Sequence, residues 1–271
     1  MHSKFVNSAR RASKVQSDLW ELFHENSKVG RLSPSVPNDL VVAWTDIFTE
    51  SLEYSQHPKI PLPPSAKPLT GSVQDAIVRR VSVRNFSSEP VAFDDMAALL
   101  HYSYGVNRPK GDHKGARSFR NVPSGGGLCP LDVYFYAHAV ERLEHGVYHY
   151  DPIGNCLRMI LEGDFSHIWS GVLVQPELAE AGMVMFIAAQ FERSLFKYQD
   201  RGYRFILLEA GHLAQNLNLV ATSLGLGCCV IGGYFDREAD RLLGLDGLRN
   251  STIYMAAVGH SAAQTSQAPI S

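Results

Sequence analysis

The sequence lacks an excess of charge of either sign and lacks a long hydrophobic run. Its 25 lysine and arginine residues stand against 27 aspartate and glutamate residues, so the formal net charge is −2. That balance gives no support for nucleic acid or an anionic membrane as a partner. The least charged stretch, residues 210–235, contains His212, amides and glycines, so it fails the criterion for a membrane span. We expect this charge-free stretch to be buried on all sides, in the core or in a subunit interface.

Cysteine is scarce, and the residues that usually bind zinc are not spaced as ligands. The four cysteines form no Cys-x-x-Cys pair, which predicts reduced thiols in a cytoplasmic protein. The first sixteen residues are rich in arginine and serine; they faintly resemble a transit peptide, but a mobile N-terminus is the favoured interpretation. His145 and His149 lie in a segment whose aromatic alternation predicts a strand, so we interpret them as a pair on a strand surface. The sequence has no His-Glu-x-x-His, and we predict no metal site.

Three further active-site signatures are missing. The sequence contains neither a phosphate-loop Gly-Lys-Ser/Thr nor a Gly-x-Ser-x-Gly elbow. Gly225 and Gly227 start a pattern like the dinucleotide fingerprint, but its third glycine is absent and the pair ends a helix instead of opening one. These absences exclude the commonest nucleotide and hydrolase sites.

The chain divides into an extension, a compact domain and a tail. Residues 1–70 are an irregular extension with a short amphipathic helix at residues 18–24. The proline-rich residues 58–64 are predicted to be an extended linker. Residues 71–260 form the domain, and residues 261–271 form the tail. At this length one generous domain with an extension is expected.

The domain alternates helical and strand patterns, with no internal repeat. Ser72 and Asp75 resemble a capping box for a helix that ends near Arg79. A second helix covers residues 93–104 and is closed by Gly105. A loop over residues 106–130 follows, and a long helix covers about residues 201–224. Strands are predicted at residues 132–138, 146–150, 183–190, 228–231 and 252–258. The predicted fold class is α+β, with a mostly antiparallel or mixed sheet packed on long helices.

The most informative motif is Arg80-Val-Ser82-Val-Arg84. In an extended segment these three polar side chains point to one face. Guanidinium groups match phosphate oxygens in a planar fork, and serine adds a hydroxyl. Taken alone, a solvated basic edge would be the favoured interpretation. The serine between the arginines, and the glycine-rich segments elsewhere, favour a phosphate site.

Two glycine-rich segments would allow main chain to approach a flat ligand. Pro123, Ser124, Gly125 and Gly126 precede a strand, and three consecutive glycines here cost backbone entropy without packing in return. Gly232-Gly233 ends a buried strand. A flexible loop and a tight strand-to-helix turn are the plain alternatives.

Lys197 and Tyr198 are the candidate proton-transfer pair. An ammonium beside a phenol favours the phenolate, which can act as a base. A surface lysine beside a half-buried tyrosine is the ordinary interpretation of such a dipeptide, and only family context favours the chemical one.

Together these motifs resemble the SagB-type dehydrogenases, or McbC-like oxidases, a branch of the nitroreductase-like flavoproteins. The resemblance covers about residues 70–260. It rests on the order of short motifs: Arg80-x-Ser82-x-Arg84-x-Phe86, Pro123-Ser124-Gly125-Gly126, Gly146-x-Tyr148-x-Tyr150, Lys197-Tyr198, Arg201-Gly202-Tyr203-Arg204, Glu209-Ala210-Gly211-His212 with Gln215-Asn216, and Gly232-Gly233.

The resemblance implies a homodimeric α+β sandwich with FMN at the interface. It assigns Arg80, Ser82 and Arg84 to the ribityl phosphate and Gly232-Gly233 to the reactive edge of the ring. Pro123–Gly126 would reach the flavin from the partner subunit, and Lys197-Tyr198 would remove a proton. Members often carry further basic residues near the C-terminus; here Arg79 or His260 would have to complete the phosphate site instead. Members also often carry tyrosine at the position where this chain has Cys129.

The function implied is FMN-dependent oxidation of a thiazoline or oxazoline to the thiazole or oxazole. The substrate would be a peptide or a carrier-protein-bound intermediate of natural-product biosynthesis, with biosynthetic enzymes as further partners. Two alternatives stay open: an NAD(P)H-dependent nitroreductase or quinone reductase, and a flavin-binding or degenerate dimer that acts as a scaffold.

Overall fold

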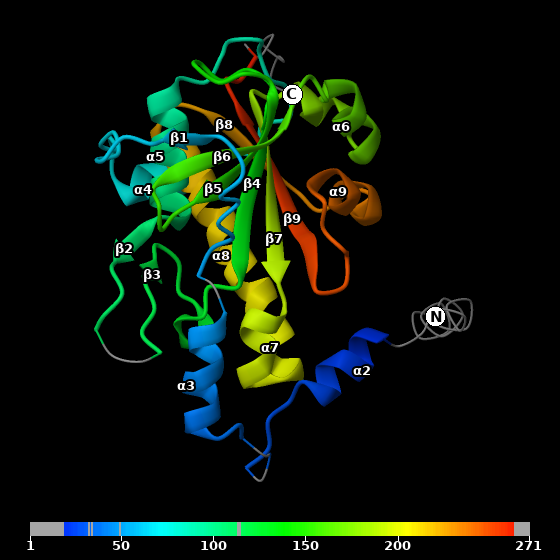
Figure 1. The fold of residues 1–271 in the computed structure, drawn as a ribbon. Coiled ribbons are helices and arrows are strands. Elements are labelled where there is room, and N and C mark those ends of the chain that lie inside the picture. The colour runs from blue at the N-terminus through cyan, green and yellow to red at the C-terminus, as the bar shows by residue number, and fades with distance from the viewer. Residues whose placement is uncertain (1–18, 32, 34, 49, 113–114, 263–271) are drawn as a thin grey trace, which may run out of the picture.

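The fold is built on a seven-stranded sheet in which all neighbouring strands run antiparallel (Figure 1). The computed structural model describes residues 19–31, 33, 35–48, 50–112 and 115–262. Within them the strand order is β1-β6-β5-β4-β7-β9-β8. The strands are β1 (Lys59–Pro61), β4 (Leu131–Ala137), β5 (Gly146–Asp151), β6 (Cys156–Glu162), β7 (Met183–Gln190), β8 (Gly227–Ile231) and β9 (Asn250–Gly259). The short strands β2 (Val106–Arg108) and β3 (Phe119–Arg120) pair separately.

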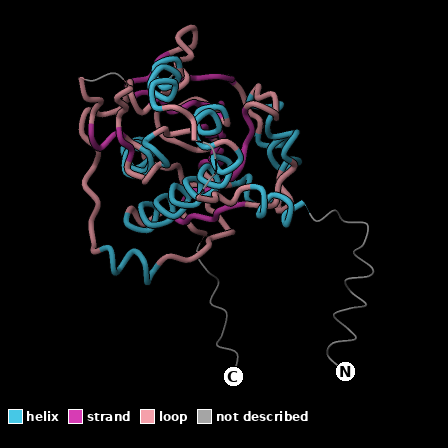
Figure 2. The backbone as a smooth tube through the Cα atoms, turned by 90° about the horizontal axis from the view of Figure 1, so that it is seen from below, coloured by secondary structure: helices cyan, strands magenta, loops and turns pink. Residues whose placement is uncertain are grey.

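Helices cover both faces of this sheet, so its central strands are buried on both sides. The helices are α2 (Leu19–Asn26), α3 (Asn38–Ile47), α4 (Val73–Arg79), α5 (Phe93–Tyr104), α6 (Ser166–Val172), α7 (Glu192–Tyr198), α8 (Asp200–Ser223) and α9 (Asp236–Leu243), with 3-10 turns η1 (Gly125–Gly127) and η2 (Pro176–Glu180). Figure 1 shows α4, α5 and α8 on one side of the sheet and α6 and α9 on the other. One apolar core lies under α5 and α8, and a second lies under α6, η2 and α9. Seen from below, helices surround the strands (Figure 2).

The predicted helix boundaries are confirmed where the sequence carries its own signals. Ser72 Oγ accepts a hydrogen bond from the Asp75 amide at 3.1 Å, and the Asp75 carboxylate accepts one from the Ser72 amide at 3.2 Å, which completes the capping box of α4. Helix α5 ends at Gly105, where a Cβ would collide with the His101 carbonyl oxygen. The strand predicted at residues 183–190 is β7. The α+β fold class with a mostly antiparallel sheet is confirmed.

Two expectations are corrected. Residues 59–61 are extended, as predicted, but they are no linker, because they pair with β6. They form the edge strand of the sheet, a position at which proline is tolerated. Strand β6 and helices α3, α6 and α9 were not predicted. His149 is not on a strand surface: it is completely buried beside Asp132.

The charge-free helix is covered on one side in the single chain: α8 buries one face, and Gly211, His212 and Gln215 are exposed. Burial of the exposed face in a subunit interface stays a prediction. The predictions for the first sixteen residues, and for the tail beyond residue 262, fall outside the described residues. Among the helices that the structure describes, none has both the length and the apolar character that crossing a bilayer would require.

Candidate flavin and proton-transfer site

Segment 80–84 lies along β8, at the edge of the main sheet. Ser82 forms a parallel bridge with Cys228, and the Val83 amide donates to the Cys228 carbonyl at 3.0 Å. Gly227 makes this close approach necessary, since a Cβ there would lie 2.8 Å from the Val83 side chain. Val83 therefore packs inward, while Ser82 and Arg84 are exposed. The outward-facing guanidinium and hydroxyl groups are a donor set suited to a phosphate.

The other phosphate-site candidates lie beside this segment. Arg80 caps the end of α4, and the Arg84 guanidinium donates to the Ser82 carbonyl at 3.3 Å. Arg79 is the basic residue of the last turn of α4, as predicted, and lines a depression with residues 222–225 at the end of α8. His260 directly follows β9, and its carbonyl accepts the Ser87 amide at 2.8 Å.

Gly232-Gly233 follows β8 directly and is exposed. The Gly233 carbonyl accepts the Val174 amide at 3.0 Å, which fixes this main chain against the end of α6. A Cβ at Gly232 would meet nothing within 4 Å, so the space beside it is open to a ligand. Open main chain beside a basic segment fits a flat, phosphorylated group such as FMN.

Lys197 and Tyr198 lie at the other end of α8, against the glycine loop of residues 124–127. A Cβ at Gly126 would collide with the Tyr198 hydroxyl and would lie 3.0 Å from Lys197 Nζ. Gly126 has φ +65°, a conformation that glycine adopts without strain. The Tyr198 ring also meets Phe205 edge-on, with ring centroids 5.0 Å apart. The fold therefore brings two of the predicted motifs, 123–126 and 197–198, into direct contact.

A buried carboxylate supports the glycine loop from beneath, and sequence reasoning gave it no role. Tyr104 Oη donates to Glu209 Oε1 at 3.2 Å. Burial raises the pKa of Glu209 to about 7, although hydrogen bonds from Ser124 and Tyr104 act against it. The signal was present in the sequence, because Glu209 is the only carboxylate of α8 beyond its first turn.

Cys129 also lies under this loop and does not line an open pocket wall. Its side chain is buried, and its amide donates to Ser124 Oγ at 2.9 Å. Burial raises the pKa of the Cys129 thiol to about 11, so the thiol stays protonated.

The N-terminal extension forms the outer wall of a cavity beside Lys197 and Tyr198. The cavity has a volume of about 450 Å³ and is lined by residues 26–29, Ser33, Ser35, 197–201 and Phe205. Arg201 Nη1 donates to the Ser27 carbonyl at 3.0 Å, and Arg204 donates to the His24 carbonyl at 3.3 Å. These bonds hold the last turn of α2, and the residue that follows this helix, against the start of α8.

Comparison with protein-family models shows the family of this chain. The model of the nitroreductase family matches residues 77–260, which include both groups of candidate residues. The chain belongs to the nitroreductase family. Membership in the nitroreductase family places it among oxidoreductases.

Three curated relatives match over part of their lengths. MJ1384 of Methanocaldococcus jannaschii, named as a candidate nitroreductase, is 37% identical over 172 residues, 63% of this chain and 83% of the relative. The microcin B17-processing protein McbC of Escherichia coli is 32% identical over 47% of this chain and 49% of McbC. The trifolitoxin-processing protein TfxB of Rhizobium leguminosarum is 29% identical over 50% of this chain and 38% of TfxB. The match thus spans half or less of the two processing proteins.

Solved structures share the nitroreductase fold. A candidate nitroreductase from Anabaena variabilis has TM-score 0.66 and 26% identity, over 86% of this chain and 49% of that one. A chain of the E. coli microcin synthetase McbBCD complex, with truncated pro-MccB17 bound, has TM-score 0.60 and 22% identity, over 90% and 92%. A candidate nitroreductase from Desulfovibrio desulfuricans, solved in complex with FMN, has TM-score 0.50 and 19% identity, over 74% and 93%. The last two matches concern the fold alone.

Proposed function

We propose that the chain is an FMN-dependent azoline oxidase of the SagB type, which converts a thiazoline or oxazoline in a peptide or carrier-bound intermediate to the aromatic azole. The observation that carries this proposal is the contact between the glycine loop and the Lys197-Tyr198 pair, beside a cavity large enough for a ring substituent. The partial matches to two peptide-processing proteins support the substrate class.

The phosphate segment and the Lys-Tyr pair lie at opposite ends of α8. This helix has 24 residues, so its ends are about 36 Å apart. Ser82 is bridged to β8 just after the helix ends, whereas Lys197 and Tyr198 immediately precede it. One chain therefore does not gather both groups around a single ligand.

A two-fold dimer would bring the two groups together. Helix α8 exposes one stripe, formed by Leu207, Leu208, Gly211, His212 and Gln215. If two copies pack these stripes antiparallel, the start of one α8 lies beside the end of the other. Each site would then combine Arg80, Ser82, Arg84 and Gly232-Gly233 of one protomer with residues 123–126 and 197–198 of its partner.

In this proposal each residue has a defined task. Arg80, Ser82 and Arg84 hold the phosphate, and the main chain at Gly232-Gly233 lies along the ring. A bound FMN would supply the hydride acceptor. Tyr198, with the Lys197 ammonium beside it, takes the proton from the acidic ring carbon of the azoline. The glycine loop holds the Tyr198 hydroxyl in position, and the residues around the cavity exclude water.

Lys197→Ala tests the chemistry without testing the fold. The variant should keep its bound flavin but reduce it with a thiazoline peptide at least about 100-fold more slowly, the usual scale of general-base effects. Lys59→Ala, on the edge strand β1, is the matched control and should behave as wild type. Unchanged flavin reduction in Lys197→Ala would remove this pair from the mechanism.

The alternative function is an NAD(P)H-dependent nitroreductase or quinone reductase, favoured by the match to 83% of MJ1384. The two functions differ in the source of electrons. If anaerobic NADH or NADPH bleaches the bound flavin rapidly and a thiazoline peptide does not, the alternative holds. If the purified protein takes up no flavin on titration, both enzyme proposals fail and a scaffold remains.

A further inference from the structure

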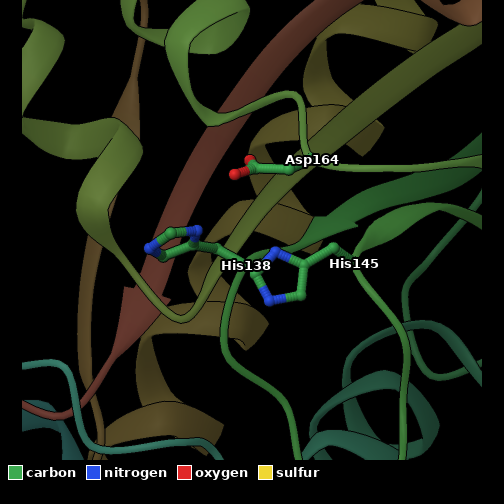
Figure 3. A group of neighbouring side chains, drawn as sticks. All are labelled: His138, His145 and Asp164. Atoms are coloured by element: carbon green, nitrogen blue, oxygen red, sulfur yellow. The ribbon is translucent and has the colours of Figure 1, made fainter.

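Two histidines and an aspartate converge at the end of the sheet that lies away from α7. His138 follows the last residue of β4, His145 immediately precedes β5, and Asp164 lies between β6 and α6. One potential ligand atom of each side chain lies within 4.8 Å of those of the other two. Figure 3 shows the two imidazole rings and the carboxylate turned toward one shared space. The three residues come from two different loops, which is why no spacing motif in the sequence reveals them.

From this arrangement we infer that His138, His145 and Asp164 form a binding site for a divalent transition metal, with zinc as the ion that this ligand chemistry favours. Two imidazoles and one carboxylate are a ligand set found at zinc sites that keep a fourth position open. Tetrahedral ligands about 2.0–2.1 Å from zinc are about 3.4 Å apart. To bind zinc, the ligand atoms would therefore have to approach one another by about 1.4 Å at most from their separation of up to 4.8 Å. His145 and Asp164 are exposed, so their side chains have room to move by that amount.

Neighbouring groups already orient the Asp164 carboxylate, as a metal ligand requires. Asp164 Oδ1 accepts hydrogen bonds from Tyr136 Oη at 2.8 Å and from the Ser166 amide at 2.9 Å. The hydrogen bonds to Oδ1 leave Oδ2 available to a metal. Such support of a ligand by surrounding groups is typical of metal sites.

The histidines sit on backbone that is equally well fixed. The His138 amide donates to the Gly182 carbonyl at 3.0 Å, and the Gly163 amide donates to the His145 carbonyl at 2.9 Å. The rings of His138 and His145 meet edge-on, with centroids 5.8 Å apart. In addition, Nδ1 of His138 is buried and has no hydrogen-bond partner within the described part of the chain. A metal would give that imidazole an interaction that the protein does not supply.

The metal would fasten the β4–β5 connection to the start of α6. Helix α6 ends at Val172, and Val174 donates to the Gly233 carbonyl of the proposed flavin site. The ion lies at the opposite end of β4 from the glycine loop, so it has a structural role and takes no part in proton transfer. The proposal does not depend on the identity of the substrate or on the presence of flavin.

The test is zinc binding to chelator-treated full-length protein without a polyhistidine tag. Isothermal titration with ZnCl₂ should show one ion per chain at micromolar affinity or better, and zinc should raise the melting temperature. His145→Ala and Asp164→Asn should each weaken binding at least tenfold and abolish the thermal shift. Tyr136→Phe, which keeps all three ligands, should weaken binding by a smaller factor. His167→Ala removes an exposed histidine of α6 outside the group and should bind as wild type.

Cobalt identifies the ligands independently of folding. Bound Co²⁺ should give visible ligand-field bands without the intense near-ultraviolet absorption of a thiolate, because all four cysteines are buried elsewhere. Thiolate absorption, absence of binding below millimolar zinc, or equal affinity in wild type and His145→Ala would each overturn the proposal. A loss of metal binding with unchanged flavin content would leave the proposed function intact.

Discussion

At the scale of single residues, Gly126 and Gly127 make a matched pair. Both have left-handed backbone, with φ +65° and +67°, so alanine at either position should cost about 1–2 kcal/mol of stability. Only at Gly126 would the new methyl group collide with the Tyr198 hydroxyl, whereas at Gly127 it would meet Phe119 at 3.6 Å. We expect Gly126→Ala alone to reduce the rate of substrate-dependent flavin reduction, measured by stopped-flow absorbance. Equal rates in the two variants would show that the loop does not position Tyr198.

Glu209 makes stability depend on pH. Its pKa rises from 4.5 in the unfolded chain to about 7 in the folded one, so the folded state binds the extra proton between these values. Stability from this group is fully present below pH 4.5 and is lost as the pH rises toward 7, by about 3 kcal/mol in total. In Glu209→Gln the free energy of unfolding should lack this dependence on pH. Denaturant unfolding at pH 5 and pH 8 checks it, and a parallel pH profile in both proteins would contradict it.

At the scale of elements, α7 is anchored by a buried ion pair. Arg193 Nη1 lies 3.0 Å from Asp132 Oδ2 on β4, and His149 Nε2 lies 3.5 Å from the other carboxylate oxygen. Burial raises the pKa of Asp132, but Arg193 and His149 outweigh burial and hold that pKa below its usual range. Because Arg193 is four residues before Lys197, this anchor fixes the helix that carries the proton-transfer pair.

Arg193→Leu should destabilise the protein by about 3–5 kcal/mol, because Asp132 is left as an uncompensated buried charge. The double variant Asp132→Leu with Arg193→Leu should recover most of that loss. Arg241→Leu is the control, since its pair with Glu238 is exposed and worth about 0–1 kcal/mol. Chemical denaturation measures all three, and an equal loss in the single and double variants would show that the pair is not coupled.

At the scale of the whole molecule, the exposed stripe of α8 predicts that assembly and flavin binding are linked. Leu208 is 54% exposed in the single chain. We expect Leu208→Glu to yield monomers by light scattering and to lose its flavin in the same preparation, because each site needs both protomers. Leu248→Glu, at a position 84% exposed and outside the stripe, should remain dimeric and yellow. A monomeric Leu208→Glu protein that retains stoichiometric flavin would contradict the shared site.

The sequence by itself determined the fold class, the capped helices and the buried strand of residues 183–190, because local hydrogen bonding and hydrophobic periodicity act over a few residues. It also singled out the short motifs, since arginine, glycine and lysine-tyrosine carry their chemistry in their side chains. It missed β6 and α6, whose patterns are weak and whose structure depends on packing against the sheet. Only the tertiary structure decided that the glycine loop contacts Tyr198, that Glu209 lies beneath that loop, and that the phosphate segment lies at the far end of α8. Those relations join residues distant along the chain, and only long-range packing fixes the space between them.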